Sequence, residues 1–115
     1  MPRDWTQFLD DMVKATQRAL EYCGGYTARA LQKDVMRLTA ITHEIQTIGE
    51  AAKRIPNEIC QLAPSIPWKD IRGVRDMLVH DYFDIRNDIV IDVCLTELPA
   101  LLAELLQLQK ALEPK

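Results

Sequence analysis

The residues best suited to chemistry lie together between positions 75 and 82, in the sequence Arg-Asp-Met-Leu-Val-His-Asp-Tyr. Arg75 carries a permanent positive charge, and its guanidinium group can contact two oxygens of one phosphate at once. His80 titrates near neutral pH and can therefore move a proton, while the phenol of Tyr82 can accept a modifying group. A phosphate or phosphodiester is the ligand that suits this trio best.

The spacing of the trio does not direct all three side chains to one point on a straight helix. Arg75 and Tyr82 are seven residues apart and share nearly one stripe, whereas His80 is rotated from Arg75 by roughly 140°. Either the helix loosens near His80, or two copies of the chain share one site across a symmetric interface. We expect His80 in the last helical turn, beside Asp81 and near Asp84, where its charged form is favoured.

A purely structural role is an alternative explanation for the same residue types. Arg75 could pair with Asp70 or Asp76, His80 could lie at a helix end, and Tyr82 could fill the edge of the core. The residue types alone do not separate this alternative from a phosphate site.

The apolar residues recur at three- and four-residue steps, which is typical of helices. We predict helices over residues 4–22 and 27–55, a third that begins near Trp68 and carries residues 75–82, and a fourth from 84 or 87 to 108. In the second, the predicted apolar stripe is Val35, Leu38, Ile41, Ile45, Ile48 and Ala52. Pro99 lies inside the fourth helix and predicts a kink near Leu95. The sequence therefore predicts an all-α fold, an antiparallel four-helix bundle that forms a single domain over residues 1–115.

Composition and charge narrow the class of protein. The 115 residues carry a formal charge of −3, which argues against broad electrostatic capture of nucleic acid. A local basic cleft remains compatible with this charge, because Lys69 and Arg72 lie near the signature, and Lys53 and Arg54 end the preceding long helix. No apolar run approaches ~20 residues and the first residues do not form a signal peptide, so we expect a soluble cytoplasmic protein and no membrane partner.

Metal and disulfide chemistry are not expected. Cys23, Cys60 and Cys94 are odd in number and far apart, a pattern that favours reduced, mostly buried thiols. The carboxylates and histidines form no metal-ligand pattern, and His43 is expected to be a solvated side chain on the second helix. We therefore expect neither a metal nor a cofactor.

The pattern Arg75-x-x-x-x-His80-x-Tyr82, with the polar Asp76 after the arginine, resembles the signature of the HepT-like branch of the HEPN superfamily. Four further stretches resemble this family in the same order, so that the likeness spans about residues 5–108: residues 48–54, 64–68, 80–83 and 92–99. The complete set of segments is far more specific than Arg-x-x-x-x-His alone.

The resemblance implies a small helical ribonuclease toxin that is encoded beside a minimal nucleotidyltransferase antitoxin. It implies metal-independent endo- or exoribonuclease cleavage of tRNA or mRNA, with Arg75 and His80 as catalytic residues and Asp76 as a supporting residue. It further implies a homodimer in which both copies of the motif face one cleft, and silencing of the toxin by transfer of AMP to Tyr82.

Two further questions stay open at the level of the sequence. Glu50, Lys53 and Arg72 are candidates to line the cleft, although Glu50 and Lys53 also suit a plain surface pair. A different class of function is a non-catalytic helical adaptor that docks a nucleotidyltransferase and helps to bind its nucleotide. The chain is not itself expected to be that transferase, because it lacks a Gly-Ser turn followed by an Asp-x-Asp pair.

Overall fold

A computed structural model describes residues 4–81 and 84–114, without the side chains of His80, Asp81 and Asp84. The elements follow one another as α1 (Trp5–Cys23), α2 (Ala28–Gln32), α3 (Val35–Ala52), α4 (Asn57–Cys60), α5 (Trp68–Arg72), α6 (Val74–Leu78), β1 (Val79–Asp81), β2 (Asp84–Ile85), α7 (Asn87–Asp92), the π-helical turn η1 (Val93–Glu97) and α8 (Leu98–Ala111). None of the described helices is long and apolar enough to cross a membrane.

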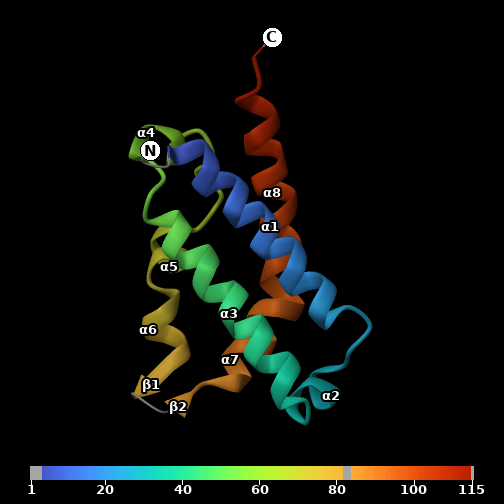
Figure 1. Ribbon diagram of the computed structural model, residues 1–115. Helices are drawn as coiled ribbons and strands as arrows, with labels where there is room; N and C mark the ends of the chain where they lie inside the picture. Colours follow the sequence, from blue (N-terminus) through green and yellow to red (C-terminus); the bar gives the residue numbers. More distant parts are fainter. Residues whose placement is uncertain (1–3, 82–83, 115) are drawn as a thin grey trace.

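The long helices lie side by side in alternating directions (Figure 1). α1 packs along α3, and α8 packs against α1 from the other side. α5 and α6 run back along α3, and α7, η1 and α8 then return in the opposite direction (Figure 1). The predicted all-α bundle is therefore confirmed, with one short hairpin, β1–β2, added at the end of α6.

The helix predicted over residues 27–55 is interrupted, and this part of the prediction is wrong. α2 ends at Gln32 and α3 begins at Val35. The carboxylate of Asp34 accepts a hydrogen bond from the backbone N–H of Arg37 at 3.0 Å, so that Asp34 caps a new helix instead of continuing the first. Val35 consequently lies on the surface with 74% of its area exposed, outside the stripe to which it was assigned. The rest of that stripe is buried as predicted: Leu38, Ile41, Ile45, Ile48 and Ala52.

The third predicted helix is wrong at both its middle and its end. It is divided at Gly73 into α5 and α6, and α6 ends at Leu78, before His80. The β-branched Val79 takes an extended conformation, and the Leu78 carbonyl accepts a hydrogen bond from the backbone N–H of Arg86 at 2.6 Å. β1 then pairs antiparallel with β2. The hydrogen bond from Arg86 to Leu78 thus takes the place of the bond that the next helical turn would form.

The fourth predicted helix departs from α-helical geometry close to the expected position. Residues Val93–Glu97 form a π-helical turn directly before α8, which contains Pro99 in its first turn. Proline has no N–H to bond to the carbonyl four residues earlier, and a wider turn accommodates this loss. α8 continues to Ala111, three residues beyond the predicted end.

Candidate functional site

Arg75 lies on α6, a single short helix that is fixed to the core from one side. Val74 and Leu78 are buried with 8% and 0% of their area exposed, and they hold this helix against the bundle. Arg75, Asp76 and Met77 occupy the positions between them and are exposed to solvent. The packing of α6 therefore presents the guanidinium group of Arg75 outward.

The guanidinium group of Arg75 is not neutralised by the neighbouring carboxylates. Among the side chains that the structure describes, Arg75 makes no ion pair and no hydrogen bond, so it pairs with neither Asp70 nor Asp76. The ion pair of Arg75 with Asp70 or Asp76, which the sequence allowed as a purely structural role, is thus not formed. An exposed, unpaired arginine is available to a phosphate ligand.

His80 lies in β1, and not in the last helical turn as predicted. Because α6 ends at Leu78, the rotation of roughly 140° expected on a straight helix does not apply between Arg75 and His80. The two positions are only five apart along the chain, and the change from helix to strand lies between them. Tyr82, the expected modification site, lies outside the described residues.

Arg72 contacts neighbouring elements of its own chain. Its Nε donates to the carbonyl of Ala52 at 3.4 Å, and its Nη2 lies 3.1 Å from the Sγ of Cys60. Arg72 is half-buried and therefore joins α5 to the end of α3 and to α4. These contacts direct two of its donors away from solvent.

Glu50 and Lys53 pair with each other near the end of α3, with 3.2 Å between Lys53 Nζ and Glu50 Oε1. Both side chains are largely exposed. Glu50 also lines a hollow of about 420 Å³ to which α1 and α3 contribute, together with His43 and Arg54. His43 is exposed, as predicted.

A larger groove of about 700 Å³ lies beside α6 and receives residues from α3, α5, α7, η1 and α8. Its floor is apolar and includes Ile45, Ile48, Ile71, Val74 and Leu101. Five carboxylates also line it: Asp70, Asp88, Asp92, Glu97 and Glu104. Asp88 and Asp92 are four residues apart on one helix, and this spacing is a sequence signal of the acidic edge that was not recognised from the sequence.

The carboxylates give the groove a negative charge, which disfavours anionic ligands. Arg86 pairs with Asp88 at 3.1 Å, whereas Asp70, Asp92 and Glu97 form no ion pair with any described residue. No three His, Cys, Asp or Glu side chains in the described ranges are placed to hold a metal ion. Like charges repel, so the groove disfavours the phosphodiester backbone of RNA. The acidic groove and the exposed Arg75 are thus adjacent surfaces of opposite charge.

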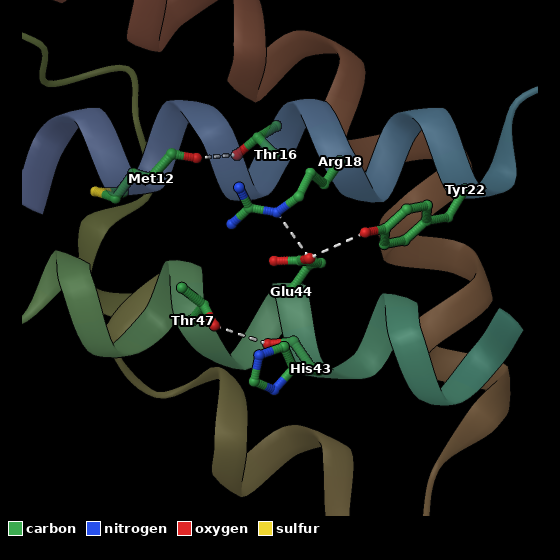
Figure 2. A network of polar contacts seen from close by, with 7 residues as sticks. All are labelled: Met12, Thr16, Arg18, Tyr22, His43, Glu44 and Thr47. Atoms are coloured by element: carbon green, nitrogen blue, oxygen red, sulfur yellow. Dashed lines mark hydrogen bonds and ion pairs between the residues drawn. The ribbon is translucent and has the colours of Figure 1, made fainter. Parts of the chain in front are cut away.

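A polar network centred on a buried carboxylate lies between α1 and α3 (Figure 2). Glu44 has only 6% of its area exposed, and it accepts hydrogen bonds from Arg18 Nε at 2.8 Å and from the hydroxyl of Tyr22 at 3.5 Å. The hydrogen bond to Glu44 raises the pKa of Arg18. Figure 2 shows both α1 side chains converging on the α3 carboxylate, an arrangement in which each group already has a partner.

Comparison with known proteins agrees with the signature. The family model described as "Ribonuclease HepT-like" matches residues 12–108. A protein of Thermococcus cleftensis named "Probable ribonuclease HepT" is 28% identical over 110 residues, which cover 96% of this chain and 100% of that protein. A protein of Caldanaerobacter subterraneus subsp. tengcongensis named as a "Putative RNase" is 31% identical over 106 residues, which cover 90% of this chain and 95% of that protein. A third, of Methanocaldococcus jannaschii and also named as a "Putative RNase", is 29% identical over 98% of this chain and 94% of its own length.

No solved structure shows significant similarity to this chain. The family match extends over most of the helical bundle and includes the whole stretch from Arg75 to Tyr82. The chain therefore belongs to the HepT-like ribonuclease family.

Proposed function

We propose that this protein is the ribonuclease toxin of a toxin–antitoxin pair, that it cuts tRNA or mRNA without a metal, and that Arg75 and His80 perform the cleavage. The observation that carries the proposal is the exposed guanidinium group of Arg75 on α6, unpaired among the described side chains and followed directly by the strand that contains His80. Family membership and the relatives named as ribonucleases support the same activity.

The proposed reaction is an internal transfer of the phosphodiester. Neutral His80 of one subunit takes the proton of the ribose 2′-hydroxyl, and the resulting oxygen attacks the adjacent phosphorus. The 5′-oxygen leaves with a proton from the protonated His80 of the other subunit, which yields a 2′,3′-cyclic phosphate. Arg75 stabilises the additional negative charge of the phosphorane-like transition state. Asp76 acts as a supporting residue beside Arg75.

A homodimer with one shared cleft brings the two histidines together. A two-fold axis beside α6 places Arg75 and His80 of each subunit near those of its partner. Two exposed apolar side chains, one within the signature and one just after it, support pairing at this surface: Met77 with 48% and Ile85 with 41% of their area exposed. Burial of these two side chains would stabilise the dimer.

Transfer of AMP to Tyr82 by a cognate nucleotidyltransferase is the proposed means of silencing. The modification adds a phosphodiester charge and a nucleoside next to the residues that bind RNA, and both oppose a second phosphate backbone. In a strain that co-expresses the transferase, Tyr82→Phe is expected to stay toxic while the wild type is silenced. Equal silencing of both proteins would show that Tyr82 is not the switch.

The direct test of the ribonuclease is incubation of purified wild type and His80→Ala with total RNA in the presence of a chelator, followed by mapping of the RNA ends. We expect discrete cuts with cyclic-phosphate ends from the wild type alone. The intact mass must first show that Tyr82 carries no AMP, and the sample must be dimeric. Absence of cleavage by such a sample would overturn the proposal.

The acidic groove favours a second candidate function, a non-catalytic adaptor that docks a nucleotidyltransferase. An apolar floor with an acidic edge suits a protein surface better than RNA. Growth on induction separates the two functions. A toxin arrests growth and requires His80, whereas an adaptor does neither.

A further inference from the structure

Two cysteines that are distant in sequence meet inside the bundle. Cys23 is the last residue of α1, and Cys94 is the second residue of η1. Their Sγ atoms lie 2.6 Å apart although 71 positions separate the residues along the chain. Non-bonded carbon atoms, which are smaller than sulfur, pack at about 3.5–4.0 Å. The two free thiols are in direct contact as hydrogen-bond partners, and only a small further approach separates them from the about 2.05 Å of a disulfide.

The packing of the helices holds the two sulfur atoms together. α1 and η1 contact each other directly. The Sγ of Cys94 lies 3.4 Å from the carbonyl of Ala19, and the Sγ of Cys23 lies 3.7 Å from the carbonyl of Leu20. Both cysteines are buried, with 4% and 0% of their area exposed. Both thiols therefore lie against the last turns of α1, in positions that the surrounding core determines.

We propose that Cys23 and Cys94 form an intramolecular disulfide when the protein meets a small-molecule disulfide oxidant. One cysteine thiolate attacks the oxidant, breaks its S–S bond and releases one of its halves as a thiol. The second cysteine thiolate attacks the resulting mixed disulfide and releases the other half as a thiol. Two cysteine sulfurs are oxidised, two sulfurs of the oxidant are reduced, and the two cysteine protons pass to the released thiols.

The bond would fasten the end of α1 to the π-helical turn. Val93 and Glu97 of the same turn line the acidic groove, so the bond would restrain that side of the groove. Burial and the neighbouring Cys23 thiol raise the pKa of Cys94, so Cys94 is a neutral thiol at neutral pH. Oxidation therefore proceeds through local opening of η1, and the dithiol is the resting state in a reducing environment.

Cys60 provides an internal control. It is also buried, with 8% of its area exposed, and burial raises its pKa too. Its sulfur contacts Arg72 Nη2 at 3.1 Å and the carbonyl of Ile55 at 3.8 Å. Neither of the other two cysteines is among the hydrogen-bond partners that the structure gives it. If burial of a thiol were sufficient for oxidation, Cys60 would therefore be oxidised as well.

The test is equilibration of the folded full-length chain with oxidised glutathione, followed by an acid quench, alkylation of remaining thiols and peptide mapping by mass spectrometry. We expect two of the three thiols to be lost, a Cys23–Cys94 cross-linked peptide, and complete alkylation of Cys60. Three alkylated thiols, a bond to Cys60 or a bond between chains would overturn the proposal. So would a Cys23–Cys94 bond that forms only in urea, because native packing would then not be its cause.

Thermal unfolding gives an independent measurement. A bond that closes a loop of this length is expected to raise the Tm of the oxidised protein over the reduced one by about 10 °C. Cys60→Ser should keep this shift, and Cys94→Ser should lose it. Should Cys94→Ser fail to fold, the peptide map of the wild type still decides the question. An equal Tm for oxidised and reduced wild type would contradict the proposed bond.

Discussion

Two regions of the molecule use arginine in opposite ways. Between α1 and α3, Arg18 donates to the buried carboxylate of Glu44 at 2.8 Å (Figure 2). On α6, Arg75 is exposed and has no ion-pair partner among the described side chains. The first arginine contributes to the packing of the bundle, and the second is available to a ligand. The partners that the fold provides thus separate two residues that look alike in the sequence.

Other arginines resemble Arg18 in having partners. Arg37 donates to the carbonyl of Tyr22 at 2.7 Å and lies over the ring of Tyr26 at 4.2 Å. Arg72 donates to the carbonyl of Ala52. Because such side chains are already engaged and an acidic groove lies alongside, we expect RNA binding by this chain of charge −3 to be concentrated at the α6 edge.

The largest expected effect comes from replacing Arg75, the exposed arginine of the two. Arg75→Ala should lower kcat/KM for RNA cleavage by about 10²–10³-fold, because one preorganised donor to the transition state is lost. Its free energy of unfolding should change by less than about 0.5 kcal/mol, because the side chain is exposed and forms no ion pair with the side chains that the structure describes. Cleavage kinetics and urea unfolding measure the two quantities. Strong destabilisation with intact cleavage would reverse the assignment of the two regions.

A glycine at the contact between α3 and α6 tests how α6 is positioned. A Cβ at position 49 would lie 2.7 Å from Val74 Cγ1 and 2.9 Å from the Ile71 carbonyl. Gly49→Ala should therefore cost about 1–3 kcal/mol of stability and reduce cleavage, because α5 and α6 must shift.

Gly73→Ala is the matched control for this substitution. Its added Cβ would meet nothing closer than 3.5 Å, and its φ of −93° suits alanine. Urea unfolding should show a change of less than about 1 kcal/mol. Equal destabilisation by both substitutions would refute the close contact at Gly49.

Replacement of Arg18, the arginine that pairs within the bundle, should lower the stability moderately and leave RNA cleavage unchanged. Arg18→Ala leaves Glu44 buried without its cation and should cost about 1–2 kcal/mol, the lower range for a broken buried pair because 45% of the Arg18 side chain is exposed. Cleavage below the unfolding temperature should equal that of the wild type. Glu44→Gln, which keeps an oxygen acceptor, should cost less in the same unfolding assay.

The smallest expected effect concerns acid stability at the start of α1. Hydrogen bonds from the Thr6 hydroxyl and from the backbone N–H of Gln7 lower the pKa of Asp4. Because the folded pKa is depressed, the stabilisation is present above the ordinary value of about 3.9 and is lost as the pH falls through the lower folded value. Asp4→Asn keeps an N-cap acceptor without titrating. Circular dichroism during acid titration should show a shallower loss of helix for this variant.

Several expectations from the sequence are confirmed, and the reason is local periodicity. The helices and the stripe from Leu38 to Ala52 follow from a repeat that the helix itself imposes on a short segment. The interruption at Asp34 and the early end of α6 were missed, because a side-chain cap and a hydrogen bond from Arg86 outweigh the continuing apolar pattern. The roles of Arg75, His80 and Tyr82 stay predictions for experiment.

By itself, the sequence determined the helical class, most of the buried stripe and the family signature, because each is written in residues that are close together along the chain. Only the tertiary structure decided which side chains that are far apart along the chain meet. Arg18 and Glu44 are 26 positions apart, Cys23 and Cys94 are 71 apart, and the carboxylates of the groove come from both sides of the hairpin. Such contacts depend on how the helices pack, which no local pattern specifies.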